Sequence, residues 1–142
     1  MQILDVAPSG AARRCPFRWA YNRQMVSNTK NCWRIPHRPA LSVLERDKNC
    51  VYCAVQLLER MPARGSRAKA PTWEHIINDA RIITKQNIAR CCVSCNASKG
   101  MQPLQVWLQS SYCGERGITA ESVAPIVKQA LRLTGKINSR SR

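Results

Sequence analysis

Acidic residues are scarce in this sequence: 142 residues hold 8 Asp and Glu against 23 Lys and Arg, for a formal net charge of +15. So large a positive excess predicts a polyanionic partner, and nucleic acid is the commonest one. The basic residues are spread along the chain and do not form one separate tail. The charge argues against an adaptor that makes protein contacts alone, and a solvated basic surface is the remaining alternative.

Long apolar runs are also missing. No stretch approaches the roughly 18 apolar residues of a membrane span. The first residues, Met1 to Asp5, lack the basic-then-apolar order of a secretory signal. We therefore expect a cytoplasmic protein with no membrane partner, in which cysteines serve as thiols or metal ligands before they form disulfides.

Four of the eight cysteines are arranged as two close pairs. Cys50 and Cys53 form one Cys-x2-Cys turn, Cys92 and Cys95 form another, and 38 residues separate them. Two such turns can close a tetrahedral four-thiolate site, which suits Zn²⁺. With four protein ligands the site has no open position, so the sequence predicts a structural zinc that helps to hold a small domain together.

The other cysteines lack this spacing. Cys91 stands beside Cys92 and is in principle an alternative ligand. Cys15, Cys32 and Cys113 could join His37 in a second metal site, or they could be buried apolar side chains or free thiols.

The pattern of apolar residues and turn signals predicts an α+β fold. A helix is expected from Pro39, followed by a flexible basic loop over residues 62–71. Residues 72–77 and 88–92 have strand character and could pair as a hairpin, and a helix then runs to a stop at Gly100.

Two further helices are expected toward the C-terminus. One opens at Pro103, and the other runs from a cap at Thr119 to Gly135, with Pro125 bending its second turn. The predicted organisation is an irregular basic extension (1–37), a main domain (38–113), a helix packed on it (114–135) and a disordered basic tail (136–142).

A recognisable order of polar residues lies between and after the cysteine pairs. Glu74-His75-Ile comes first, Asn87 follows, and Asn96 and Lys99-Gly come directly after Cys95. In this order and spacing, residues 41–112 resemble the HNH endonucleases that carry a four-cysteine zinc. The resemblance implies a small ββα-metal finger domain with zinc knuckles and additional C-terminal helices, which hydrolyses phosphodiester bonds of DNA, with RNA as the alternative substrate.

The resemblance also implies a role for each matching residue. His75 matches the general base, and an ordinary pKa near 6.5 suits that task. Glu74 and Asn96 match the ligands of the catalytic ion, and their oxygens suit Mg²⁺ or Mn²⁺. Asn87 completes the catalytic set as the residue that braces the loop behind the histidine. One site per chain would nick DNA, and a double-strand cut would need a dimer or a second visit.

Basic residues near this motif are candidates for holding the nucleic acid. Lys99 matches a lysine of the family's helix and could meet phosphate. Arg81, Lys85 and Arg90 surround the motif in sequence and could contact the strand backbone.

Two alternatives follow from the residues themselves. Adjacent residues of a strand point to opposite faces, so Glu74 and His75 line one site only if the strand bends or ends there. Asp79 is the substitute ligand if Glu74 misses the ion. The competing function is a non-catalytic, zinc-stabilised module that binds nucleic acid on the same scaffold.

Overall fold

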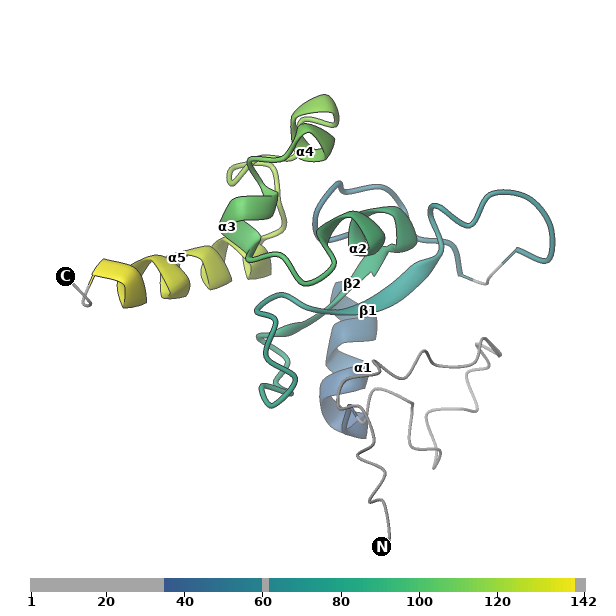
Figure 1. The fold of residues 1–142 in the computed structure, drawn as a ribbon. Helices are drawn as coiled ribbons and strands as arrows, with labels where there is room; N and C mark the ends of the chain where they lie inside the picture. Colours follow the sequence, from purple (N-terminus) through teal and green to yellow (C-terminus); the bar gives the residue numbers. More distant parts are fainter. Residues whose placement is uncertain (1–34, 60–61, 140–142) are drawn as a thin grey trace, which may run out of the picture.

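The computed structural model describes residues 35–59 and 62–139, with the side chains of residues 136–139 left aside. Predictions for Cys15, for Cys32 and for most of the N-terminal extension therefore lie outside the described residues. The elements are α1 (His37–Arg46), β1 (Pro71–His75), β2 (Ile88–Cys92), α2 (Val93–Lys99), α3 (Leu104–Trp107), α4 (Ser111–Glu115) and α5 (Pro125–Ser139) (Figure 1). The mixed α+β character predicted from the sequence is confirmed.

The two strands form an antiparallel hairpin, with Glu74 opposite Ala89 and His75 opposite Ile88. The pairing continues one step beyond β1, because the Ile76 amide donates to the Asn87 carbonyl at 2.9 Å. β1 is therefore regular up to its last residue. Successive side chains along it face opposite sides of the hairpin.

Each side of the hairpin is covered by a different apolar cluster. The main core includes Tyr52, Ile76 and Trp107, and the rings of Tyr52 and Trp107 meet edge to face with centroids 4.9 Å apart. On the other side, α1 packs Val43 against Ile88 and its neighbours. Figure 1 shows the hairpin between α1 below and α2 above. Side chains on the two faces of β1 thus point toward two separate apolar clusters.

Helix α2 follows β2 without a loop and lies along the free edge of β1. The Asn96 Nδ2 donates to the Trp73 carbonyl at 3.3 Å, and the Lys99 Nζ donates to the His75 carbonyl at 3.4 Å. Gly100, with φ +50°, is the C-cap, as the sequence predicts. Hairpin and helix together form one ββα unit.

The C-terminal part departs from the prediction at Thr119 and Pro125. Thr119 and Ser122 form a local turn in which the Thr119 hydroxyl accepts from the Ser122 amide and the Ser122 hydroxyl accepts from the Thr119 amide. Helix α5 begins only at Pro125. Placing Pro125 in a second turn was wrong, because proline fits the first helical position, where its missing N–H removes no helical hydrogen bond.

Helix α5 also continues past Gly135 to Ser139, so the prediction of a disordered tail is wrong for residues 136–139. An interior glycine costs about 1 kcal/mol relative to alanine but keeps its N–H, so it weakens a helix without ending it. Val127 and Ala130 are buried in the main core, which places α5 against the rest of the chain. The short helix α4 was not predicted, and Ser110 caps it by accepting from the Cys113 amide.

Candidate functional site

The four paired cysteines come together in space. Their Sγ atoms all lie within 4.8 Å of one another, and the Sγ atoms of Cys53 and Cys92 are 3.8 Å apart. Zn–S bonds of about 2.3 Å in a tetrahedron place sulfurs about 3.8 Å apart. Cys50, Cys53, Cys92 and Cys95 can therefore hold a structural metal such as zinc, as their spacing predicts.

The turns around these thiols supply hydrogen-bond donors. Cys95 donates its backbone N–H to the Cys92 Sγ at 3.4 Å, and the Tyr112 hydroxyl donates to the Cys95 Sγ at 3.5 Å. Donors of this kind stabilise thiolates, which are the form that binds a metal.

Cys91 is not part of this cluster. It is fully buried in the main core, where burial raises the pKa of its thiol well above the usual value. Cys113 is likewise a buried member of that core, whereas His37 is exposed on α1. Within residues 35–59 and 62–139, the four-cysteine cluster is the single group of three or more metal-binding side chains. Cys113 and His37 therefore belong to no such group within these ranges, and the other two members of the alternative second site, Cys15 and Cys32, lie outside them.

Glu74 faces the main core, not solvent. The residue is 5% exposed, and its Oε1 lies 2.6 Å from the Lys99 Nζ and 3.0 Å from the Tyr52 hydroxyl. Burial raises the pKa of the carboxyl, and the Lys99 ammonium acts in the opposite direction. The carboxylate is thus already matched with a positive charge inside the protein.

Lys99 is 0% exposed, so the prediction that it contacts phosphate is wrong for this conformation. Its ammonium lies within hydrogen-bond distance of three oxygens: Glu74 Oε1 at 2.6 Å, Asn78 Oδ1 at 3.1 Å and the His75 carbonyl at 3.4 Å. A lysine ammonium has three protons to donate. All three have acceptors within the ββα unit and the start of its loop.

His75 ends β1 on the side of the hairpin that faces α1, and its side chain is half-buried. Burial lowers the pKa of its imidazole, the Lys99 ammonium lowers it further, and the Asp79 carboxylate partly opposes both. The lowered pKa favours the neutral imidazole. A neutral imidazole is the form that can accept a proton.

The predicted ligands of a catalytic cation do not form a site with His75 in this structure. Glu74 and His75 point to opposite faces because β1 is regular through both residues. The half-buried Asn96 donates its amide to the Thr72 hydroxyl at 3.1 Å and to the Trp73 carbonyl. The Glu74 carboxylate, one of the two predicted ligands of Mg²⁺ or Mn²⁺, is thus held by Lys99 here, and the Asn96 side chain is anchored to β1 through its amide nitrogen.

Asn87 is 3% exposed and braces the loop between the strands. Its Oδ1 accepts from the Ile77 amide at 2.7 Å, and its Nδ2 donates to the carbonyls of Ile77 and Ile82 at 3.1 and 3.2 Å. These bonds hold residues 76–87 against the end of β1. The geometry gives Asn87 a positioning role behind His75, with its amide turned to backbone groups.

Two of the predicted phosphate-contacting arginines have partners inside the protein. Arg90 is 7% exposed, its backbone N–H donates to the Asp47 carboxylate and its guanidinium donates to the Asp47 backbone carbonyl, so little of its side chain is offered to phosphate. Arg81 is exposed and binds Asp79 through two nitrogens at 2.9 and 2.8 Å, which lowers the pKa of Asp79 to about 2. Asp79, the substitute ligand, is thus held by Arg81. Lys85 is exposed, and its contact with nucleic acid remains a prediction.

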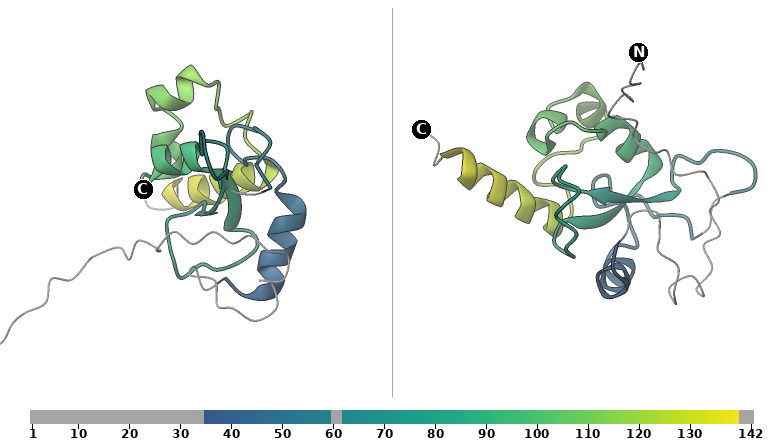
Figure 2. Two further views of the ribbon diagram at one scale, coloured as in Figure 1. Left: turned by 90° about the vertical axis from the view of Figure 1, so that its right-hand side faces the viewer. Right: turned by 60° about the horizontal axis from the view of Figure 1, so that its bottom comes forward.

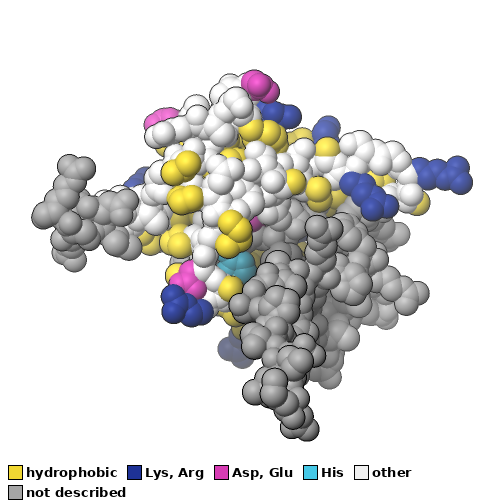
Figure 3. Space-filling view, viewed as in Figure 1, with side chains coloured by type: hydrophobic (Ala, Val, Ile, Leu, Met, Phe, Trp, Pro, Cys, Tyr) yellow, Lys and Arg dark blue, Asp and Glu magenta, His cyan; other side chains and the backbone are white. Residues whose placement is uncertain are grey.

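Exposed basic residues also occur in the loop before β1, at Arg64, Arg67 and Lys69. This loop and the far end of α5 extend in opposite directions from the hairpin (Figures 1 and 2). On the face shown in Figure 3, the Lys and Arg side chains lie at several separate places, with hydrophobic side chains between them. The positive charge on that face is therefore distributed and does not form one patch.

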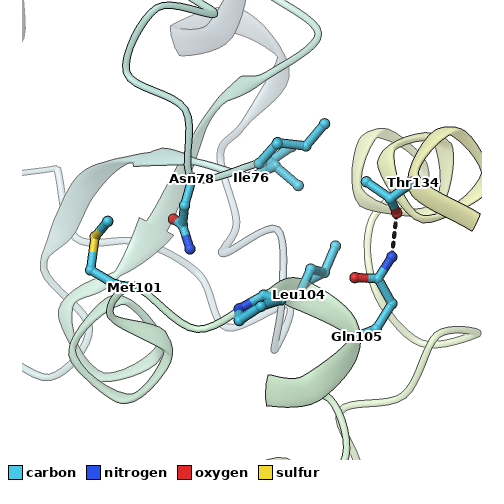
Figure 4. A pocket seen from close by; sticks show the side chains of 8 residues that line it. Ile76, Asn78, Met101, Leu104, Gln105 and Thr134 are labelled. Atoms are coloured by element: carbon cyan, nitrogen blue, oxygen red, sulfur yellow. Dashed lines mark hydrogen bonds between the residues drawn. The ribbon is translucent and has the colours of Figure 1, made fainter. Parts of the chain in front are cut away.

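A hollow of about 200 Å³ lies beside the Lys99 network, on the side of the main core. Ile76, Met101 and Leu104 make most of its lining apolar, and Gln105 donates to Thr134 across one end (Figure 4). Asn78 lines it too and donates to the Gln102 carbonyl at 2.9 Å. No set of groups suited to acid–base chemistry converges on this hollow from the described residues.

Sequence reasoning missed Tyr52, Asn78 and Asp47 as partners of the site residues. Tyr52 lies inside the first Cys-x2-Cys turn, and Asn78 follows β1 at the start of the loop between the strands. The available signal was the position of Glu74 in an otherwise apolar strand: a buried carboxylate needs hydrogen-bond donors or a positive charge beside it.

Comparison of the chain with known protein families, with curated proteins and with solved structures gave no match. Among the described helices, none has the length and apolar character needed to cross a membrane.

Proposed function

We propose that this protein is a nuclease of the HNH, or ββα-metal, type that hydrolyses phosphodiester bonds of DNA. The supporting observation is the position of His75 at the end of β1, in a hairpin that runs directly into α2 and is flanked by the two cysteine pairs. Zn²⁺ is the structural ion proposed for those cysteines, because four thiolates at this spacing suit it.

His75 acts in this proposal as the general base that takes a proton from the attacking water. Its lowered pKa favours the neutral imidazole, and the side chain is half-buried at the end of a strand. Lys99 holds its carbonyl and Asn87 holds the loop that follows it. Fixed surroundings of this kind keep a base in a productive orientation.

The family resemblance implies a divalent cation, which would stabilise charge in the transition state. The contacts of Glu74 do not fit such an ion, because the Lys99 Nζ lies 2.6 Å from its Oε1 in a buried ion pair. In this proposal no step of phosphodiester hydrolysis therefore depends on a cation bound by Glu74.

A second candidate function is a non-catalytic module that binds nucleic acid on the same scaffold. The ion pair between Glu74 and Lys99 favours it, because a carboxylate neutralised inside the protein is not offered to a catalytic ion. The net charge of +15 is equally suited to both functions.

Cleavage of supercoiled plasmid by the zinc-loaded full chain separates the two. Reactions contain Mg²⁺, Mn²⁺ or EDTA, and zinc content is measured after each. We expect nicking by the parent, loss of nicking in His75→Ala, and normal nicking in His37→Ala, which alters the exposed second histidine. Equal cleavage by His75→Ala would disprove the proposed mechanism. Tight, salt-sensitive binding without cleavage by any of the three would establish the binding module instead.

A further inference from the structure

The buried ion pair between Glu74 and Lys99 occupies the position where the sequence motif predicts a metal. We propose that the Lys99 ammonium is a built-in counter-cation, which takes the place at Glu74 that a divalent cation would need and fixes the end of β1. The inference rests on the proposed function in one respect only, namely that His75 is the residue held in place.

The first argument is the contact geometry. The Lys99 Nζ and Glu74 Oε1 atoms are 2.6 Å apart, and the Tyr52 hydroxyl donates to the same oxygen at 3.0 Å. A carboxylate and an ammonium at this distance form a strong, charge-assisted hydrogen bond. One of the two carboxylate oxygens of Glu74 is therefore already shared by two donors.

The second argument is burial. Lys99 is 0% exposed and Glu74 is 5% exposed, so neither group can turn to solvent without opening the packing of α2 on β1. A hydrated Mg²⁺ keeps several waters when it binds. To reach Glu74, such an ion would have to displace Lys99 and leave a buried ammonium without its carboxylate, which is costly.

The third argument is the location of the three acceptors. The Lys99 ammonium reaches the Glu74 side chain, the His75 carbonyl and the Asn78 side chain, which all lie within five consecutive residues. These residues include the end of β1 and the start of the loop that Asn87 braces. Lys99 is thus a positioning residue that ties α2 to the backbone of His75.

The test measures Mn²⁺ binding to the zinc-loaded full chain, using the electron paramagnetic resonance signal of free Mn²⁺. The variants are E74Q, K99M and E74Q/K99M. We expect E74Q to leave Mn²⁺ affinity unchanged and K99M to raise it about tenfold, because the freed carboxylate becomes a ligand. The double variant should not show that gain. A tenfold loss of affinity in E74Q would overturn the proposal, since it would show that Glu74 binds the ion with Lys99 in place.

Thermal unfolding of the same variants provides a second readout, which remains available if K99M does not fold. Each single change leaves one buried charge alone and should lower Tm by about 10 °C, whereas the double variant should recover most of that loss. Strictly additive losses would contradict the proposed pairing.

Positioning is tested by the ¹⁵N-histidine NMR signals of the double variant. We expect the His75 signals to shift or broaden while those of His37, on α1, stay unchanged. Unchanged His75 signals would refute the positioning role. None of these experiments uses cleavage, so they can confirm the role of the ion pair even in a protein that does not cut DNA. Failure of the proposed nuclease function is therefore distinguishable from failure of the proposed role of Lys99.

Discussion

Glu74 and His75 are neighbours in the chain, yet their side chains enter opposite sides of the hairpin. The carboxylate lies 2.6 Å from the Lys99 ammonium in the main core, whereas the imidazole stands on the side covered by α1. A regular strand up to its last residue produces this separation. It gives the two residues separate tasks: Glu74 belongs to the packing of α2 on β1, and His75 is the group proposed for proton transfer.

The four-cysteine cluster should govern the stability of the fold. Cys53→Ala removes one of four ligands, and we expect loss of the bound zinc and a clear drop in Tm, because metal-binding energy contributes to folding. Zinc content by mass spectrometry and thermal unfolding check this. Cys91→Ala is the matched control: it is a buried cysteine outside the cluster, and it should retain one zinc per chain. Zinc loss in the control alone would show that Cys91 is the ligand.

Asn87 should stabilise the loop of residues 76–87. Asn87→Ala leaves the Ile77 amide and two carbonyls without their partner, and we expect a loss of about 1–3 kcal/mol. Denaturant unfolding measures the loss, and amide hydrogen exchange should show faster exchange within the loop. Asn49→Ala, at an exposed position, should change stability by less than about 0.5 kcal/mol. Equal effects of the two substitutions would argue against the bracing role.

The lowered pKa of His75 predicts a dependence of stability on pH. The unfolded chain takes up a proton near pH 6.5, while the folded imidazole resists protonation because it is partly buried near Lys99. The contribution of His75 is therefore fully present above pH 6.5 and is lost progressively as the pH falls from there through the lower pKa of the folded imidazole. Melting curves between pH 7.5 and 5.5 should show a smaller decline for His75→Asn than for the parent. Parallel declines would contradict the shift.

The loop before β1 should contribute to nucleic-acid binding. Within the described residues, no acidic group forms an ion pair with Arg64, Arg67 or Lys69, in contrast to Arg81, which binds Asp79. Replacing all three by alanine should weaken binding and reduce the salt slope by up to about 2.7, because each phosphate that a basic side chain neutralises adds about 0.9 to the slope. Fluorescence anisotropy at several salt concentrations measures both quantities. Arg81→Ala should alter the slope by less than about 1, and an unchanged slope in the triple variant would exclude the loop from the interface.

Local features of this protein were predictable from the sequence. The spacing of Cys50, Cys53, Cys92 and Cys95 identified the metal cluster, because a Cys-x2-Cys turn brings two thiols together whatever surrounds it. The strand over residues 88–92 and the helix stop at Gly100 were also predicted correctly, from the local run of residues and from the glycine itself. Each of these depends on short-range geometry, which a sequence encodes directly.

The partners of the polar residues were decided only by the tertiary structure. Lys99 and Arg90 looked like phosphate contacts in the sequence, but packing places Lys99 beside Glu74 and Arg90 beside Asp47. Which face of a strand is covered, and by which distant helix, depends on how the whole core closes. A buried charge must then find its partner inside the fold, because no water is there to replace it.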